Sequence, residues 1–327
     1  MSVTGDTRTP EVVCIGEPLV ALVGRELGPL QTTDTFSAHV TGAELNVAVG
    51  LARQGVSVAF VGRRGCDAFG ERVARTLRAE GVGTTHLRAD PDAPTGMLVR
   101  NLRPFGSAEV MYARARAAGS RLDEEDVRAA ASEIAAARFI HVTGITPALS
   151  EASAQAVQAA VKIAREAGTA VSVDINLRAR LCDLETQRQA LHPVLAAADL
   201  VFCGEDEGVL LTGAEDAFAV ASELQASGAK QIVIKRGAEG ATVFGAGDQR
   251  IAHPARDVVP VDLVGAGDAF AAGYLAALLR DLDVETALRA AVTTAACVIT
   301  ARGDIDGLPD QRELATAMET NVPQTTR

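Results

Sequence analysis

The sequence predicts an α/β fold in which helices cover both faces of a mostly parallel sheet. Short apolar runs alternate along the chain with longer segments in which apolar residues recur at helical spacing. The short runs are apolar throughout, as is typical of parallel strands that are buried on both faces. No internal repeat or low-complexity linker interrupts the alternation, so we expect residues 1–327 to form one domain.

The apolar runs predict six buried strands in chain order, at Val12–Ile15, Val58–Val61, Phe139–Val142, Ala170–Val173, Leu200–Cys203 and Ile232–Ile234. Helical spacing lies between them at Glu44–Gln54, Ala68–Glu80, Glu124–Ala137, Glu151–Ala167, Thr186–Ala198 and Ala217–Ala226. A strand-like stretch at Val258–Val261 and two closing helices, Ala266–Arg280 and Val284–Ala301, follow. The tail after Gly307 is polar, and we expect it to be loosely attached.

Two segments, at about 19–40 and 96–112, do not fit this alternation. Both carry Thr, Val, Leu and Phe in a looser, strand-like pattern without a helix beside them. The pattern predicts β-strands that leave the main sheet and form a small lid, which would exclude water from a reactive group. An ordinary antiparallel extension of the sheet explains the same residues equally well.

Composition excludes several classes of partner. The net charge of −11 argues against nucleic acid or an anionic membrane. Hydrophobic residues make up 48% of the chain and supply a sizeable core, yet no stretch of about 18 apolar residues predicts a membrane span. The N-terminus lacks the apolar centre of a signal peptide. The five cysteines show no C-x-x-C pair and the five histidines no metal-binding spacing, so we expect buried free thiols in a reducing cytoplasm.

The residues most informative about chemistry are 262–268, Asp-Leu-Val-Gly-Ala-Gly-Asp, which precede an Ala-rich stretch predicted to be helical. Backbone N–H groups at a helix start, reinforced by the helix dipole, form a site for anions. Asp268 places a carboxylate beside this site, and an anion site next to a proton acceptor suits phosphate transfer to a hydroxyl group. Alternatively, Asp268 is only a favourable charge in the first helical turn. No Gly-Lys-Ser/Thr follows, so this is not a Walker loop.

With the five residues that follow it, this segment resembles the C-terminal signature of the ribokinase-like (PfkB) carbohydrate kinases. Thr41–Asn46 resembles the family's N-terminal Gly-Gly-x-x-x-Asn, and Gly62–Gly70 resembles its Gly-x-x-Gly-x-Asp-x-x-Gly. The motifs occur in the expected order and extend from about Val12 to Gly307. The resemblance implies a ribokinase-like three-layer α/β/α fold with a small β-strand lid, and a kinase that uses ATP and Mg²⁺.

The resemblance also implies catalytic roles for the glycine-rich segment. Asp268 would be the general base that takes the proton from the sugar hydroxyl. Gly265, Ala266 and Gly267 would form with it the anion hole for charge that develops on the γ-phosphate.

Three further residues would lie beside the nucleotide: Lys235, Gly237 and Gly240. The same stretch is also explained as a turn between two strands, and both interpretations can hold. Glu207 would help to organise Mg²⁺, although Gly204 stands where the family usually has Asn. Magnesium retains waters and takes few protein carboxylates, so one missing amide is tolerable.

On the sugar side, Tyr112-Ala113-Arg114 resembles a lid segment of the 2-keto-3-deoxygluconate kinases. Asp174–Arg178 resembles the family's Asp-x-Asn-x-Arg, and Arg302-Gly303-Asp304 its closing Arg-Gly-Asp. The resemblance implies six substrate contacts: Gly42, Asn46, Tyr112, Arg114, Arg178 and Asp304.

An independent argument concerns the two arginines of this set. A sugar acid needs a cation or a helix end at its carboxylate, and Arg114 and Arg178 could supply guanidinium groups. Taken alone, each is more often a solvated surface residue. Arg178 follows a predicted strand, at the edge of the sheet where ligands of open α/β sheets bind.

Three positions depart from the lid and sugar motifs of these kinases. Thr41 replaces the first glycine of the usual pair, Ala113 stands where a second tyrosine is frequent, and Leu98 stands at a frequent lid tyrosine. Fewer hydroxyl groups would therefore line the sugar pocket.

The hypothesis from the sequence is an ATP-dependent kinase that phosphorylates 2-keto-3-deoxygluconate to its 6-phosphate, with Asp268 as base. The alternatives are a fructokinase- or ribokinase-like enzyme for a neutral sugar, a nucleoside kinase, and a non-catalytic sugar sensor on the same fold. Lid strands leave exposed edges, so we also expect a homo-oligomer.

Overall fold

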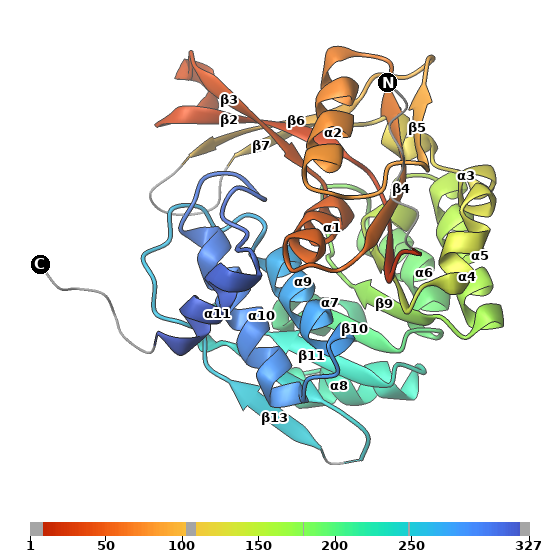
Figure 1. The fold of residues 1–327 in the computed structure, drawn as a ribbon, viewed down its shortest axis with the longest axis vertical. Coiled ribbons are helices and arrows are strands. Elements are labelled where there is room, and N and C mark those ends of the chain that lie inside the picture. Colours follow the sequence, from red (N-terminus) through yellow and green to blue (C-terminus); the bar gives the residue numbers. More distant parts are fainter. Residues whose placement is uncertain (1–8, 103–108, 179, 248, 321–327) are drawn as a thin grey trace, which may run out of the picture.

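A computed structural model of the chain describes residues 9–102, 109–178, 180–247 and 249–320, which contain two β-sheets (Figure 1). The larger sheet has nine strands in the order β13-β12-β11-β10-β9-β8-β1-β4-β5. Strands from β5 to β11 along this order run parallel, and β12 and β13 are antiparallel additions at one edge. The strands are β1 (Val12–Ile15), β4 (Val58–Gly65), β5 (Leu87–Asp90), β8 (Phe139–Thr143), β9 (Ala170–Asp174), β10 (Leu200–Gly204), β11 (Gln231–Lys235), β12 (Ala241–Phe244) and β13 (Arg250–His253). All six predicted strands are confirmed.

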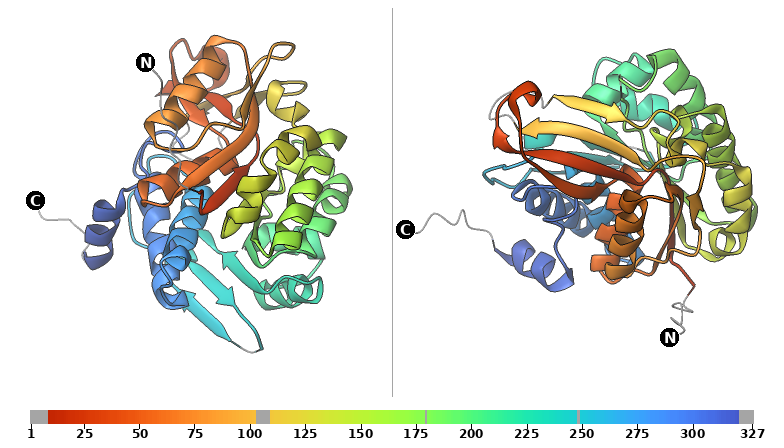
Figure 2. Two further views of the ribbon diagram at one scale, coloured as in Figure 1. Left: turned by 45° about the vertical axis from the view of Figure 1, so that its right-hand side comes forward. Right: turned by 90° about the horizontal axis from the view of Figure 1, so that it is seen from above.

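Helices cover both faces of the large sheet, because its apolar strands bury side chains on both sides (Figure 2). In β1, Val12 and Cys14 pack with α1, α9 and α10, whereas Val13 and Ile15 pack with α3 to α6. The helices are α1 (Ala43–Arg53), α2 (Ala68–Ala79), α3 (Glu124–Ala129), α4 (Ala131–Ala136), α5 (Glu151–Ala167), α6 (Leu184–Leu195), α7 (Glu205–Thr212), α8 (Ala217–Ala226), α9 (Ala266–Leu279), α10 (Val284–Ile299) and α11 (Gln311–Glu319). The predicted three-layer arrangement is therefore present.

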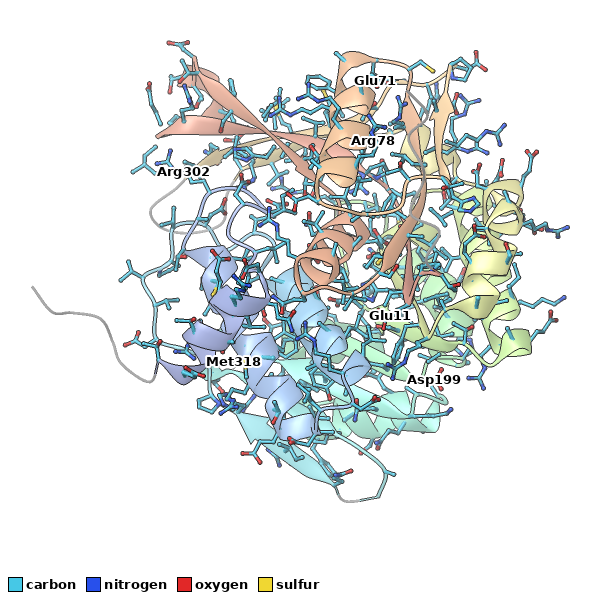
Figure 3. All side chains as sticks on the ribbon, in the orientation of Figure 1. Glu11, Glu71, Arg78, Asp199, Arg302 and Met318 are labelled. Carbon is cyan, nitrogen blue, oxygen red and sulfur yellow. The ribbon has the colours of Figure 1, made fainter. Side chains whose placement is uncertain are left out.

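Many charged side chains lie on the outside of these layers (Figure 3). Glu71 and Arg78 of α2 are exposed, as the amphipathic pattern of this helix requires. No helix in the described ranges is long and apolar enough to cross a membrane.

Helix α9 differs from the others because it is apolar on all sides and buried on all sides. Its close neighbours approach through small residues. A Cβ atom on Gly50 of α1 would lie 2.6 Å from the Cβ of Ala272, and one on Gly273 would lie 2.6 Å from the hydroxyl of Thr294 in α10. This packing fixes the start of α9, where the glycine-rich segment lies.

The second sheet has four strands in the order β3-β2-β6-β7. They are β2 (Leu19–Leu27), β3 (Phe36–Thr41), β6 (Gly96–Leu102) and β7 (Val110–Ala113). The segments at 19–40 and 96–112 therefore form a separate sheet rather than an extension of the large one, although residues 103–108 lie outside the described residues. Leu27, Phe36 and Met111 expose apolar surface on this sheet, and the expected homo-oligomer stays a prediction.

The strand expected at Val258–Val261 is wrong. This segment has no regular secondary structure and pairs with no strand in the described part of the chain, and Val259 and Val261 are 85% and 51% exposed. Pro254 and Pro260 lack the N–H groups that a sheet ladder needs. The segment instead lies beside the end of α10, where Ile299 O accepts from Val261 N at 2.7 Å.

Three smaller expectations also need correction. The helix expected at Glu124–Ala137 breaks at Ala130, where the backbone leaves the helical region. The tail after Gly307 is not loose through residue 319, because Leu314 of α11 is buried in the core and a capping box at Asp310 starts that helix. The cysteines are unpaired, but only Cys14 and Cys203 are buried, whereas Cys182 and Cys297 are partly exposed and Cys66 is exposed.

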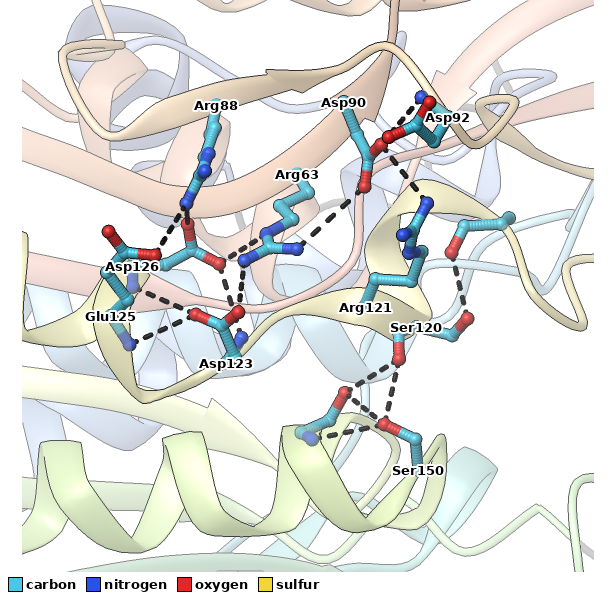
Figure 4. A network of polar contacts seen from close by, with 12 residues as sticks. Arg63, Arg88, Asp90, Asp92, Ser120, Arg121, Asp123, Glu125, Asp126 and Ser150 are labelled. Carbon is cyan, nitrogen blue, oxygen red and sulfur yellow. Dashed lines mark hydrogen bonds and ion pairs between the residues drawn. The ribbon is translucent and has the colours of Figure 1, made fainter.

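A buried ion-pair network joins β4, β5 and the start of α3 (Figure 4). Arg63 of β4 donates to Asp126 at 2.5 Å and to Asp123 at 2.5 Å, and its guanidinium lies 3.8 Å from Asp90. Asp123 also caps α3. One guanidinium thus holds together β4, β5 and the start of α3.

Replacing Arg63 with methionine should destabilise the protein by about 3–5 kcal/mol, because the buried Asp126 and Asp90 keep only the partly exposed guanidinium groups of Arg88 and Arg121 beside them. Denaturant unfolding measures the change. The matched control is Arg88→Met, whose guanidinium also reaches Asp126 but is half exposed and should matter much less. Equal effects of the two substitutions would contradict this account of the network.

Candidate active site

A cavity of about 970 Å³ lies between the carboxyl edge of the large sheet and the second sheet. Its lining includes Leu19 of β2, Leu98 of β6 and Tyr112 of β7, so the second sheet forms one of its walls. The structure brings every predicted site residue to this cavity: Gly42, Asn46, Tyr112, Arg114, Arg178, Glu207, Lys235, Gly237, Gly240, Gly265, Ala266, Gly267, Asp268 and Asp304.

The start of α9 has the geometry of an anion site. Gly265 adopts the left-handed conformation with φ 84°, and a Cβ atom there would lie 2.8 Å from the carbonyl oxygen of Asp304, so only glycine fits. No side chain in the described ranges caps the helix. The N–H groups of Ala266, Gly267 and Asp268 therefore stay available to a ligand in the cavity.

Asp268 is 9% exposed and accepts a hydrogen bond of 2.7 Å from the amide nitrogen of Asn46. Burial raises the pKa of Asp268 from its ordinary 3.8 to about 8, and the charge of Asp174 adds to the rise. The Asn46 hydrogen bond and the charges of Lys235 and Arg178 oppose the shift. A carboxyl with a pKa near 8 is a stronger proton acceptor than an ordinary aspartate.

Lys235 provides the cation nearest to the anion site. Its ammonium donates to Asp174 Oδ2 at 2.6 Å, and a Cβ atom on Gly267 would lie 3.2 Å from it. Burial lowers the pKa of Lys235, but the charges of Asp174 and Glu207 outweigh this and raise it overall. The ammonium therefore stays charged beside the first turn of α9.

Two carboxylates could hold a divalent cation here. Asp174 Oδ1 is buried with no partner in the described residues, and Glu207 Oε2 accepts from Gly204 N at 3.1 Å. Burial, followed by the charge of Asp174, raises the pKa of Glu207. No cluster of three metal-binding side chains occurs among the residues described. Mg²⁺ bound through one or two carboxylates, waters and phosphates requires none, so this donor set fits it.

Gly204, the departure from the usual Asn, has a local explanation. A Cβ atom at Gly204 would lie 3.1 Å from Glu207 Oε2. Because Gly204 has no side chain, the carboxylate of Glu207 can lie against its backbone and accept a hydrogen bond from its N–H group. A larger residue here would press on Glu207.

Two of the predicted sugar contacts, Arg114 and Arg178, already have charged protein partners. Arg114 is not a solvated arginine but is buried, and its guanidinium is paired with Glu17. Arg178 is 46% exposed and lies 3.5 Å from Glu207. The ring of Tyr112 lies 5.6 Å from the guanidinium of Arg114.

Asp304 is also engaged by protein groups. The hydroxyl of Thr41 donates to one carboxylate oxygen, and Arg100 of β6 lies 3.4 Å from the other. Arg100 donates to Asp262 at 2.5 Å as well, and Asp262 accepts from Val264 N at 3.2 Å, just before the anion site. Thr41, which replaces a usual glycine, therefore helps to hold Asp304.

Four residues near the site received no role from the sequence: Glu17, Arg100, Asp174 and Asn176, although the last two belong to the Asp-x-Asn-x-Arg motif. Glu17 and Asp174 had a signal, because they lie at the ends of predicted strands, and ligands of parallel sheets bind at that edge. Asn176 has φ 41° and a buried Oδ1 atom without a partner in the described ranges. Arg100 had no signal, since its two partners are far away in the sequence.

A family profile of pfkB family carbohydrate kinases matches residues 9–311. The chain belongs to this family. Among its curated relatives, the 2-dehydro-3-deoxygluconokinase of Thermoproteus tenax is 35% identical over 306 residues, 92% of either chain. The fructokinase of Salmonella typhimurium is 35% identical over 283 residues, 84% of this chain and 90% of its own. A putative ribokinase II from E. coli, solved in complex with ATP and Mg²⁺, has a TM-score of 0.87 at 26% identity and covers 95% of this chain and 99% of that chain.

The predicted ribokinase-like fold and the carbohydrate-kinase class are thereby confirmed for this pfkB kinase. The similarity does not choose the sugar, because a sugar-acid kinase and a fructokinase are both 35% identical to this chain.

The raised pKa of Asp268 predicts a pH-dependent cost to stability. Between about pH 4 and 8 the unfolded chain has this carboxyl ionised while the folded chain keeps it protonated, so the free energy of unfolding falls as pH rises. Asp268→Asn removes this cost. The melting temperature of the variant should exceed that of the wild type by a margin that grows across this window.

The matched control is Asp283→Asn at the start of α10. Hydrogen bonds from Thr286 lower the pKa of Asp283, so its loss should destabilise the protein above about pH 4. Thermal unfolding at several pH values measures both variants. A margin for Asp268→Asn that stays constant with pH would contradict the raised pKa.

Proposed function

We propose that this pfkB kinase transfers the γ-phosphoryl group of ATP to the terminal hydroxyl of 2-keto-3-deoxygluconate and yields the 6-phosphate. One observation carries the proposal: Asp268, a buried carboxylate, lies at the start of α9 in a cavity that Lys235, Arg114 and Arg178 also line. A proton acceptor, an anion site and cations for a substrate carboxylate are then present together.

The nucleotide would lie along the anion site and the turn after β11. The ammonium of Lys235 is placed for its phosphates, and Gly237 and Gly240 keep the turn open at positive φ. Val292 and Ile299 of α10 line the same cavity and offer an apolar surface to a purine base. The similar ribokinase II structure contains ATP and Mg²⁺. When bound by Asp174 and Glu207, Mg²⁺ would neutralise charge on the phosphates.

In the transfer step, the sugar hydroxyl attacks the γ-phosphorus and its proton passes to Asp268. The new bond joins the hydroxyl oxygen to phosphorus, the bond from phosphorus to the bridging oxygen breaks, and ADP leaves with that electron pair. The N–H groups of Ala266 and Gly267 stabilise the charge on the phosphoryl oxygens. Asn46 holds one oxygen of Asp268, which orients the other toward the hydroxyl.

The acid substrate is supported by Arg114 and Arg178 in the sugar part of the cavity, and by the similarity to 2-dehydro-3-deoxygluconokinases. A neutral sugar is the second candidate, and one observation favours it: Glu17 already compensates the charge of Arg114. The similar fructokinases fit this alternative.

A panel of sugar acids and neutral ketoses, each with ATP and Mg²⁺, tests the proposal through the release of ADP. The highest kcat/KM should belong to 2-keto-3-deoxygluconate. A higher value for fructose or ribose would replace the proposal with the neutral-sugar alternative.

Asp268→Asn should lower turnover by about 10²–10⁴-fold, the range for loss of a general base, while ATP binding persists. Steady-state kinetics and calorimetric titration with ATP measure the two effects. Near-normal turnover in this variant would contradict the role of Asp268.

Arg114→Ala and Arg178→Ala should each reduce kcat/KM for the sugar acid more than for fructose, because only the acid loses a charge-assisted contact. The assay compares both substrates on both variants. Equal losses on the two sugars would show that neither arginine binds the carboxylate.

A further inference from the structure

Glu17 is a buried carboxylate that the catalytic step does not use. It follows β1, is 1% exposed and lines the cavity. Its Oε2 atom is paired with Arg114 Nη2. Its Oε1 atom and the Nε atom of Arg114 have no partner in the described part of the chain. Buried polar atoms are rarely left unpaired, so a donor and an acceptor remain here for a ligand.

The backbone around Glu17 leaves room for this carboxylate and little else. A Cβ atom on Gly119 would lie 2.1 Å from Glu17 Cγ, and one on Gly96 would lie 2.9 Å from Glu17 Oε1. A Cβ atom on Gly42 would lie 2.3 Å from the carbonyl oxygen of Glu17. Three glycines from separate segments therefore enclose Glu17, which fixes its position beside Arg114.

The charges around Glu17 and Arg114 determine which chemical group of a substrate binds best beside them. Ionised Glu17 cancels most of the charge that Arg114 would offer to a substrate carboxylate. Glu44 adds a second buried carboxylate to the cavity wall, held by the hydroxyls of Thr143 and Thr146. A sugar hydroxyl, in contrast, finds a free acceptor at Glu17 Oε1.

We propose that Glu17 is a specificity-determining residue that limits the preference of this kinase for sugar acids over neutral sugars. Its carboxylate weakens the Arg114 subsite for a substrate carboxylate and accepts a hydroxyl group of either kind of sugar. The inference rests on the proposed function, in that the sugar binds beside Arg114.

The ionisation of Glu17 is finely balanced. Burial raises its pKa to about 7, the charge and hydrogen bond of Arg114 lower it, and the charge of Glu44 raises it. The folded protein therefore already populates a neutral Glu17 near pH 7, and an uncharged side chain at this position changes the field at Arg114 in the same way.

Glu17→Gln tests the proposal, because it keeps the size of the side chain and removes its charge. The measured quantity is the ratio of kcat/KM for 2-keto-3-deoxygluconate to kcat/KM for fructose. Loss of a negative charge near the bound carboxylate should raise this ratio by about tenfold or more. Glu17→Met, a second uncharged substitution, should raise the ratio as well, and thermal unfolding verifies that both variants fold.

Two controls separate charge from structure. Glu17→Asp keeps the charge and shortens the side chain, so the ratio should stay within about twofold of the wild type. Asp126→Asn removes a buried, paired carboxylate outside the cavity and should leave the ratio unchanged. An unchanged or lower ratio in Glu17→Gln, or an equal rise in Glu17→Asp, would overturn the proposal.

Failure of the proposed role of Glu17 can be distinguished from failure of the proposed function. If the wild type prefers fructose, the proposed substrate is wrong, yet Glu17→Gln must still raise the acid-to-neutral ratio. If the wild type prefers the sugar acid and the ratio does not rise, only the role of Glu17 fails.

Discussion

The site depends on the burial of several carboxylates along one edge of a single sheet. Each would be costly without a partner, and each finds one on a different segment: Glu17 with Arg114, Glu44 with Thr143 and Thr146, Asp174 with Lys235, Asp268 with Asn46, and Asp304 with Thr41 and Arg100. These pairs connect both sheets with α1 and α9. The chain must therefore fold as a whole before the site exists.

Asp268 and Glu44 differ from the other members of this set because their partners are neutral: an amide for Asp268 and two hydroxyl groups for Glu44. Asp174 faces an ammonium group, whereas Asp268 faces Asn46 and is left with a raised pKa. Asp268 thus lowers the stability of the resting protein and accepts a proton in the reaction. Such a trade-off between stability and activity is common at active sites. The rigid packing of α9 against α1 and α10 holds this carboxyl group in place.

The sequence predicted the parallel sheet, its two helical layers and the residues of the glycine-rich segment, because these follow local patterns. At Val258–Val261 the local pattern predicted a strand that does not form. This segment lies beside the end of α10 and next to the cavity instead of entering a sheet. Arg100 could not be predicted, because its partners Asp262 and Asp304 lie more than 160 positions away. The pairing of Arg114 with Glu17 was hidden in the same way, and it changes what that arginine offers to a sugar.

The claim that Asp268 is a buried base with a raised pKa is tested most directly by the pH dependence of kcat/KM at limiting sugar and ATP. In this regime the profile reports the ionisation of the free enzyme. The account predicts that kcat/KM rises with pH, with a midpoint at about 8, and that this rise is absent from the residual activity of Asp268→Asn. A wild-type profile that is flat from about pH 6 to 9 would contradict it.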